Sequence, residues 1–305
     1  MILSIGELLI DMISTNYAET FEEVTDFKRI PGGSPANMCM NMARLGVQAK
    51  LVAGVGNDDM GQYLIDYVAS TGVEIDLIEK KSVPTTMILV TRSQAVSNFE
   101  AYRYADKEIN HNQLTDNILR AAKIYHTTCF AISQDPAQAV IMENAHTAAR
   151  MGCQLSIDAN YAQKIWPDQD EAQLLVAEYT GLGALVKVSE VDWERLYNKP
   201  LKDPNVAADF FLKLGAREVC ITLGGDGCLV ANATERHFVE ARKVEVKDTT
   251  GAGDAFWSGY LTAWLDGKTL HQKALAGRRM AELKLAHFGP LPGSVDRGVI
   301  YEDFE

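Results

Sequence analysis

Residues 248–261 read DTTGAGDAFWSGYL, in which three small residues (Gly251, Ala252 and Gly253) stand directly before an acid and an apolar run. The apolar run predicts a helix, so the small residues predict a turn at its N-terminus. Glycine leaves no side chain to block an approaching ligand, and the first N–H groups of a helix lack intrahelical partners and carry the positive end of its dipole. The stretch therefore predicts an anion-binding turn.

Asp254 is the acid that follows this turn. A carboxylate near the start of a helix can cap the helix. It can also accept the proton of a hydroxyl that attacks an anion held by the turn, and a base beside an anion site is what phosphoryl transfer to an alcohol requires. The local sequence leaves both interpretations open.

The rest of the chain alternates short apolar runs with amphipathic segments. We expect strands at 2–6, 51–56, 124–130, 153–158, 184–189 and 218–225, and helices at 34–45, 60–70, 136–150, 171–179 and 206–214. Such alternation predicts an α/β fold, with a central, mostly parallel sheet flanked by helices on both faces. No linker or repeat divides the chain, so residues 1–305 are expected to form one domain. Strand-like stretches also occur within 237–248.

Two segments, 12–30 and 82–107, lack a helical period. Within the second, Thr85–Thr91 and Asn98–Tyr104 are β-rich runs around a polar turn. We expect both segments to form a small β-sheet that projects from the main sheet. Such an elaboration beside an α/β core can act as a lid, although a plain edge hairpin fits the pattern equally well.

Composition excludes several classes of function. The chain has 29 Lys and Arg against 41 Asp and Glu, a net charge of −12, so no nucleic-acid partner is expected. No signal peptide is evident and no apolar run approaches the roughly 18 residues of a membrane helix, so no membrane partner is expected. The cysteines are irregularly spaced, without a CxxC, which indicates reduced thiols in a cytoplasmic protein. They are Cys39, Cys129, Cys153, Cys220 and Cys228.

Four ordered patches resemble the ribokinase-like carbohydrate kinases, the PfkB family. They are PGGSPANMCMNMARLGVQAKLVAGVGNDDMGQYL (31–64), KVSEVD (187–192), TLGGDG (222–227) and DTTGAGDAFWSGYL (248–261). The resemblance covers essentially the whole chain. It implies a ribokinase-like fold and transfer of the γ-phosphate of ATP, with Mg²⁺, to a sugar hydroxyl. Asp254 would then be the catalytic base, and Gly251, Ala252 and Gly253 would form the anion hole.

The resemblance also implies roles for the other matching positions. Asp11, Gly32, Gly33 and Asn37 would hold the sugar, together with Asn160 and with Arg103 reaching from the lid. Lys187, Thr222, Gly224, Gly225 and Gly227 would bind the nucleotide, and residues 277–290 would lie near the adenine. Glu190 would organise Mg²⁺ through water, and the backbone of Asp248, Thr250 and Gly289 could bind a monovalent cation such as K⁺. Without the family, the glycines are ordinary turns, Glu190 is a helix-start acid, and Lys187 and Arg103 are surface residues.

The acceptor is predicted from three stretches that look most like the fructokinase branch. They are GELLIDMIS (6–14), GGSPANMCMNMARLG (32–46) and AYRYAD (101–106). Two departures stand against this: Ala162 occupies a position where that branch has an arginine, and Ser189 replaces the usual asparagine. Because the three stretches match that branch, fructose is the expected acceptor. The two departures leave 2-keto-3-deoxygluconate, ribose and nucleosides as alternatives. A catalytically silent sugar- or nucleotide-binding protein is the alternative outside enzymes.

A homodimer is the expected assembly. The family association suggests pairing through the lid, whose run Met87–Val90 is apolar.

Overall fold

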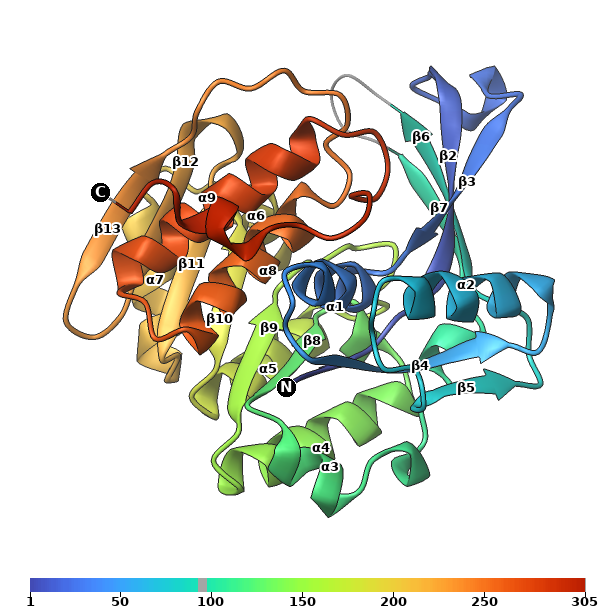
Figure 1. The fold of residues 1–305 in the computed structure, drawn as a ribbon, viewed down its shortest axis with the longest axis horizontal. Helices are drawn as coiled ribbons and strands as arrows, with labels where there is room; N and C mark the ends of the chain where they lie inside the picture. Colours follow the sequence, from blue (N-terminus) through green and yellow to red (C-terminus); the bar gives the residue numbers. More distant parts are fainter. Residues whose placement is uncertain (93–97, 305) are drawn as a thin grey trace.

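A computed structural model describes residues 1–92 and 98–304 (Figure 1). Within these residues the main sheet has nine strands in the order β13-β12-β11-β10-β9-β8-β1-β4-β5. The strands from β5 to β11 pair in parallel, and β12 and β13 extend the edge antiparallel. The strands are β1 (Ile2–Ile5), β4 (Ala49–Gly56), β5 (Ile78–Lys81), β8 (Ile124–Thr128), β9 (Gln154–Asp158), β10 (Leu185–Ser189), β11 (Glu218–Thr222), β12 (Gly227–Ala231) and β13 (Arg236–Glu240).

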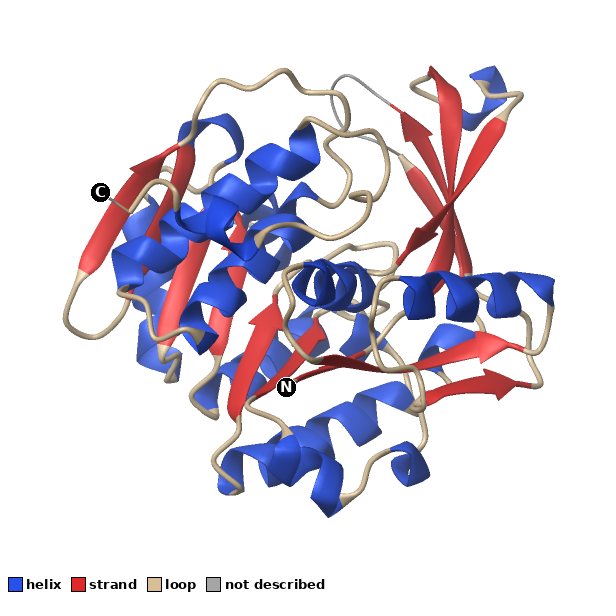
Figure 2. Ribbon diagram, in the orientation of Figure 1, coloured by secondary structure: helices blue, strands red, loops and turns tan. Residues whose placement is uncertain are grey.

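Helices cover both faces of this sheet, as expected (Figure 2). Alternate side chains of a strand point to opposite faces. Accordingly, Ile2 packs in a core with α1, α2, α8 and α9, while Leu3 packs in a second core with α3 to α7. The helices are α1 (Ser34–Arg44), α2 (Asp59–Ser70), α3 (Asp116–Ala121), α4 (Ala137–Arg150), α5 (Gln169–Gly181), α6 (Glu190–Tyr197), α7 (Pro204–Leu214), α8 (Ala252–Leu265) and α9 (Leu270–Leu285). The expected fold class is confirmed.

A separate four-stranded sheet, called the small sheet below, stands beside the main one in the order β3-β2-β6-β7 (Figure 1). Its strands are β2 (Leu9–Tyr17), β3 (Phe27–Gly32), β6 (Met87–Arg92) and β7 (Phe99–Tyr102). Strand β2 begins before residue 12, because Leu9 pairs with Gly32. Residues 105–107 form a 3₁₀ turn against β4 and not a strand.

Only the first part of the strand-like sequence within 237–248 forms a strand. Strand β13 ends at Glu240, and residues 241–250 form neither helix nor strand. Strand β13 already pairs with β12, and within residues 1–92 and 98–304 no further strand pairs with this segment, so Val246 is 54% exposed despite its β propensity. This segment is the loop that delivers the chain to α8.

Two expectations from composition concern the cysteines and membrane-spanning helices. The five cysteines are buried and unpaired. Across residues 1–92 and 98–304, none of the helices has the length and apolar character needed to cross a bilayer.

The sheet order decides where a ligand can bind. Strand β1 lies between β4 and β8, so the chain leaves β1 in one direction for β4 and returns on its other side for β8. In open α/β sheets, ligands bind beyond the carboxyl ends of the strands near such a reversal. The chain at this edge carries Glu7 after β1, Thr128 at the end of β8, Asp158 at the end of β9 and Ser189 at the end of β10.

Candidate active site

The anion-binding turn is shorter than predicted. Gly251 is the residue before α8, with φ +74°, and the helix begins at Ala252. Ala252 and Gly253 therefore already belong to the first turn of α8, whose N–H groups have no intrahelical partner. Space at 253 is tight: a Cβ there would lie 3.3 Å from Nζ of Lys187, so a larger residue would need this lysine to shift.

Asp254 does not cap its own helix. Its Oδ1 accepts a hydrogen bond from the Ser34 hydroxyl at 2.7 Å and its Oδ2 accepts one from the Asn37 amide at 3.0 Å. Both donors lie in the first turn of α1, across the site from α8. Burial and the charge of Asp158 raise the pKa of Asp254, although the bonds from Ser34 and Asn37 oppose the shift. A carboxylate with a raised pKa is a better proton acceptor near neutral pH.

The part of the site that contains Asp11 depends on two glycines. A Cβ on Gly32 would lie 2.1 Å from Oδ2 of Asp11, so Gly32 is what leaves room for that carboxylate. Gly33 has φ +105°, and a Cβ there would lie 2.2 Å from the carbonyl oxygen of Glu7. Burial, aided by the charge of Asp254, raises the pKa of Asp11 to about 7.

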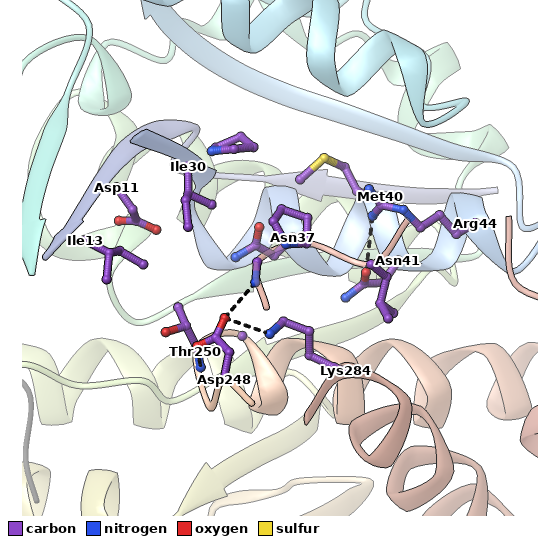
Figure 3. Close-up of a pocket in the computed structure, with 15 residues that line it drawn as sticks. Asp11, Ile13, Ile30, Asn37, Met40, Asn41, Arg44, Asp248, Thr250 and Lys284 are labelled. Atoms are coloured by element: carbon purple, nitrogen blue, oxygen red, sulfur yellow. Dashed lines mark hydrogen bonds and ion pairs between the residues drawn. The ribbon is translucent and has the colours of Figure 1, made fainter. Parts of the chain in front are cut away.

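A cavity opens beside these groups, between α1, the small sheet and the end of α9 (Figure 3). The expected residues that line it are Asp11, Asn37, Asp248, Thr250, Gly251 and Gly289. Two cationic side chains that were not expected also line it, Arg44 and Lys284. The structure thus brings predicted sugar and anion positions to one cavity.

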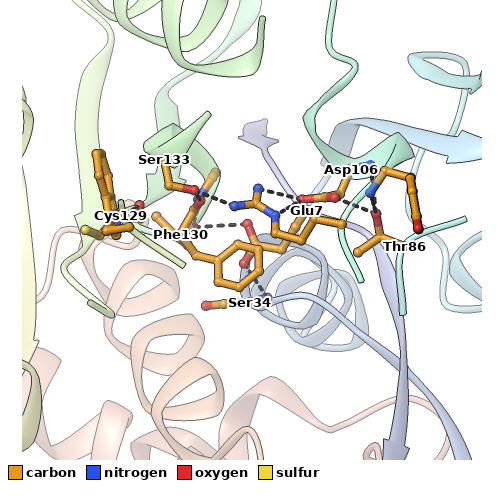
Figure 4. A network of polar contacts seen from close by, with 12 residues as sticks. Glu7, Ser34, Thr86, Asp106, Cys129, Phe130 and Ser133 are labelled. Carbon is orange, nitrogen blue, oxygen red and sulfur yellow. Dashed lines mark hydrogen bonds and ion pairs between the residues drawn. The ribbon is translucent and has the colours of Figure 1, made fainter. Parts of the chain in front are cut away.

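Arg103 and Asn160 do not line this cavity; each contacts Phe130, which is labelled in Figure 4. The Arg103 guanidinium donates twice to Asp106, at 2.9 and 2.6 Å, and once to the Ser133 hydroxyl, and it stacks over the Phe130 ring. Asn160 Oδ1 accepts the backbone N–H of Phe130 at 3.1 Å. Arg103 is buried, which excludes the surface-residue interpretation.

Glu7 is a buried acid at the centre of this network that sequence reasoning missed. It accepts the backbone N–H of Ser34 and the Thr128 hydroxyl, each at 3.1 Å. Burial raises its pKa to about 8. Its signal in the sequence is an acid immediately after a buried strand. Glu7 fixes the start of α1, and α1 carries the two donors to Asp254.

Lys187 is a buried residue of the site and not a surface lysine. Its Nζ lies 2.7 Å from Oδ2 of Asp158, and both side chains are about 95% buried. Burial opposes its charge, but Asp158 and Asp192 outweigh burial and raise the pKa of Lys187. Its position beside Gly253 places an ammonium against the first turn of α8.

Asp192 is the acid of the KVSEVD patch that faces this lysine. It caps α6 reciprocally with Ser189. Burial and the charge of Asp158 raise its pKa to about 6. Glu190 lies on the other side, where a Cβ on Gly224 would be 3.6 Å from its Oε1. Both acids therefore sit at the end of β10, Asp192 toward Lys187 and Glu190 toward the glycine turn.

The glycine turn after β11 divides into two parts. Thr222 ends β11, and Gly224 and Gly225 are exposed, with open space around Gly225. These residues are accessible to a nucleotide. Gly227 has φ +117°, and a Cβ there would lie 2.0 Å from the carbonyl oxygen of Val239, so it serves the pairing of β12 with β13.

Asp248 organises the loop before α8. Its carboxylate accepts the backbone N–H groups of Thr250 at 2.9 Å and Gly289 at 3.0 Å. It also pairs with Lys284 at 3.2 Å. Burial opposes ionisation, but these partners lower the pKa of Asp248. In the described residues, no three His, Cys, Asp or Glu side chains cluster as a metal site.

The comparison with protein families decides the identity. The model of the pfkB family carbohydrate kinases matches residues 1–296. The chain belongs to the PfkB family. This PfkB kinase is therefore a phosphotransferase that acts on a sugar hydroxyl. The alternative of a catalytically silent binding protein is not supported.

Relatives of this PfkB kinase agree on the class but not on the acceptor. It is 33% identical over 290 residues to the ATP-dependent 6-phosphofructokinase of Thermoanaerobacterium thermosaccharolyticum, covering 95% of this chain and 89% of that one. It is 31% identical over 277 residues to fructokinase-2 of Solanum habrochaites, covering 88% and 83%. An uncharacterized sugar kinase from Pyrococcus horikoshii, solved in complex with ATP, superposes with a TM-score of 0.84 at 26% identity, covering 98% and 96%.

Proposed function

We propose that this PfkB kinase phosphorylates fructose with Mg²⁺-ATP, and that Asp254 takes the proton of the attacking hydroxyl. The observation that carries the proposal is the Asp254 carboxylate in the first turn of α8, which accepts from Ser34 and from Asn37; Asn37 also lines the cavity together with Asp11. The carboxylate, the start of α8 and a cavity that Asp11 and Asn37 line are thus close together. The fructokinase relative supports fructose.

The reaction would use these residues as follows. The acceptor hydroxyl attacks the γ-phosphorus of ATP, its proton passes to Asp254, and the bond to the β-phosphate oxygen breaks. The N–H groups of Gly253 and Asp254 in the first turn of α8 and the Lys187 ammonium face the charge that spreads over the phosphoryl oxygens, whereas the N–H of Ala252 already donates to the carbonyl of Thr249 at 3.2 Å. We propose that the small sheet acts as a lid, because excluding water prevents hydrolysis of ATP.

The residues present fit Mg²⁺ held mainly by ATP and water. Mg²⁺ keeps several waters and uses few protein ligands. Asp158, Asp192 and Glu190 lie at the ends of β9 and β10. Oδ1 of Asp158 is buried without a hydrogen-bond partner. When bound, the ion would neutralise phosphate charge, and these acids would orient its waters.

Fructose 6-phosphate is the second candidate, because Arg44 and Lys284 line the cavity and two further cations lie on the small sheet, which also contributes to the lining. Lys28 and Arg92 of the small sheet lie over the ring of Phe288, at 4.5 and 5.4 Å from its centroid. In the described part of the chain no carboxylate pairs with either cation or with Arg44. An acceptor that places its hydroxyl beside Asp254 would direct a second, anionic end toward these cations. The 6-phosphofructokinase relative supports this candidate.

One panel separates the candidates. We expect ADP release to be fastest with fructose among fructose, fructose 6-phosphate, 2-keto-3-deoxygluconate, ribose and inosine, relative to a blank without acceptor. Lys28→Met should then change kcat/KM less than about twofold, as for a surface substitution. The matched control is Arg29→Met, because Arg29 lies on the opposite face of β3, over Tyr63.

The opposite results would decide for the alternatives. If fructose 6-phosphate is preferred and Lys28→Met, but not Arg29→Met, lowers kcat/KM for it roughly tenfold or more, the cations bind its phosphate. If no acceptor exceeds the blank, both assignments of the acceptor are wrong.

We also propose a homodimer through the small sheet. Met87, Leu89 and Val90 of β6 remain half-buried in the single chain, and Tyr17 and Tyr102 are 57% and 51% exposed. Exposed apolar faces of this kind favour association. Light scattering at micromolar concentration should give twice the mass of the chain, and a monomeric mass would contradict the proposal.

A further inference from the structure

The oxygen-rich loop expected to bind a monovalent cation already contains a positive charge. Lys284 lies in the last turn of α9 and is 5% exposed. Its Nζ lies 3.2 Å from Oδ2 of Asp248 and 3.5 Å from the carbonyl oxygen of His287. Carboxylate and carbonyl oxygens are the groups that bind a small cation, and here they accept from an ammonium.

The surrounding backbone fixes this ammonium in place. The N–H of Lys247 donates to the carbonyl of Leu285 at 2.8 Å, and the N–H of Gly289 donates to Asp248 at 3.0 Å. The loop before α8 and the chain leaving α9 are therefore joined on both sides of Lys284. A Cβ on Gly251 would lie 3.8 Å from Cε of Lys284, so the lysine borders the anion-binding turn itself (Figure 3).

These contacts do not suit an additional monovalent cation. A second positive charge would enter beside a buried ammonium and compete for the same carboxylate oxygen, which is unfavourable at low dielectric. We propose that Lys284 replaces the monovalent cation: its ammonium holds Asp248 and the anion-binding turn in position, and the kinase works without K⁺. Lys284 is thus a positioning residue. The inference rests on the proposed phosphoryl transfer for its effect on rate, but not for its effect on ion binding.

The test compares wild type, Lys284→Met and a matched lysine. Lys213 occupies the last turn of α7, is exposed, and lies outside the site, so Lys213→Met is the control. Each protein is measured in potassium chloride and in tetramethylammonium chloride at equal ionic strength. Melting temperature and kcat are the two readouts. The melting temperature needs no acceptor, so it tests the inference even if the proposed acceptor is wrong.

Wild type and Lys213→Met should give the same melting temperature and kcat in both salts. Lys284→Met should lose kcat roughly tenfold or more in tetramethylammonium. Potassium should restore part of that loss and raise the melting temperature, because an ion that binds the folded state stabilises it. Lys284→Arg, which keeps the charge, should retain more activity than Lys284→Met and stay indifferent to potassium.

Three results would overturn the inference. The first is a rise in the melting temperature or kcat of wild type that is specific to potassium. The second is a folded Lys284→Met protein that potassium leaves unchanged. The third is a Lys284→Met protein whose loss appears only as a higher KM for ATP or acceptor, since Lys284 would then bind substrate directly. If Lys284→Met does not fold, Lys284→Gln takes its place, and the wild-type arm is decisive by itself.

Discussion

Asp254→Asn is expected to lower kcat by about 10²- to 10⁴-fold while leaving acceptor binding nearly unchanged. The amide is nearly isosteric and can still bond to Ser34 and Asn37, but it cannot accept the proton of the attacking hydroxyl. The start of α8 and Lys187 remain, so residual activity should stay above the uncatalysed rate. ADP release gives kcat, and calorimetry with the acceptor gives the binding constant.

A second aspartate provides the control for Asp254→Asn. Asp59 lies in the first turn of α2, is exposed, and stands outside the site. Asp59→Asn makes the same chemical change at a helix start and should keep the wild-type kcat. If Asp254→Asn turns over at a rate near wild type, Asp254 is not the base.

Lys187→Met is expected to lower the free energy of unfolding by about 3–5 kcal/mol, the range found when one partner of a buried ion pair is removed. Methionine has a similar length, so the loss comes mainly from Asp158, which stays buried without its cation. The double variant Lys187→Met, Asp158→Asn should recover much of the stability and none of the activity. Urea unfolding measures the first quantity and ADP release the second.

The deficit of Lys187→Met should also depend on pH. Without the ammonium, Asp192 loses a cation that lowers its pKa, so that its pKa in the folded chain lies further above the unfolded value. A folded-state pKa above the unfolded value destabilises the ionised protein, and the penalty disappears as pH falls through the folded pKa. The pKa of Asp192 is already about 6 in the wild type, so the variant should regain stability as pH drops toward and below that value.

Another buried pair separates stability from catalysis. Lys273 in α9 lies 2.6 Å from Glu218 at the start of β11, at the opposite end of the strand from the site. Lys273→Met should destabilise the fold by a similar amount and keep kcat in the folded protein. If Lys187→Met also keeps kcat, the lysine supports the fold alone. If the double variant is no more stable than the single one, the Asp158 pair is not the source of the loss.

The sequence predicts the fold well wherever local pattern determines structure. Apolar strands of four to six residues between amphipathic helices predict the parallel sheet, and the pair Gly32-Gly33 and the 251–254 stretch predict where it binds ligands. The expectations contain no helix at 270–285, although α9 is the longest in the described residues. Several of its polar residues, including Lys273 and Lys284, are buried, because distant acids neutralise them. The spacing of apolar residues in the sequence therefore does not predict this helix.

The candidate site follows the same rule. Asp254 and the start of α8 are adjacent in sequence, so their juxtaposition can be predicted. Lys284 lies 36 residues from its partner Asp248, and Ser34 lies 220 residues from Asp254. Contacts at such separations depend on the order of the strands in the sheet, which no local pattern specifies. The contact of Arg103 with Ser133, 30 residues away, is unpredictable for the same reason.

One short segment serves both halves of the chemistry. Gly32 makes room for Asp11 at the acceptor, Gly33 starts α1, and Ser34 and Asn37 then bind the base. The predicted contact with the acceptor and the partners of Asp254 therefore depend on the same six residues. A substitution that reshapes the acceptor end of this segment also moves the groups that tune Asp254. Changing the choice of sugar without changing speed would require starting from β2, where Asp11 can be altered while the base keeps its partners.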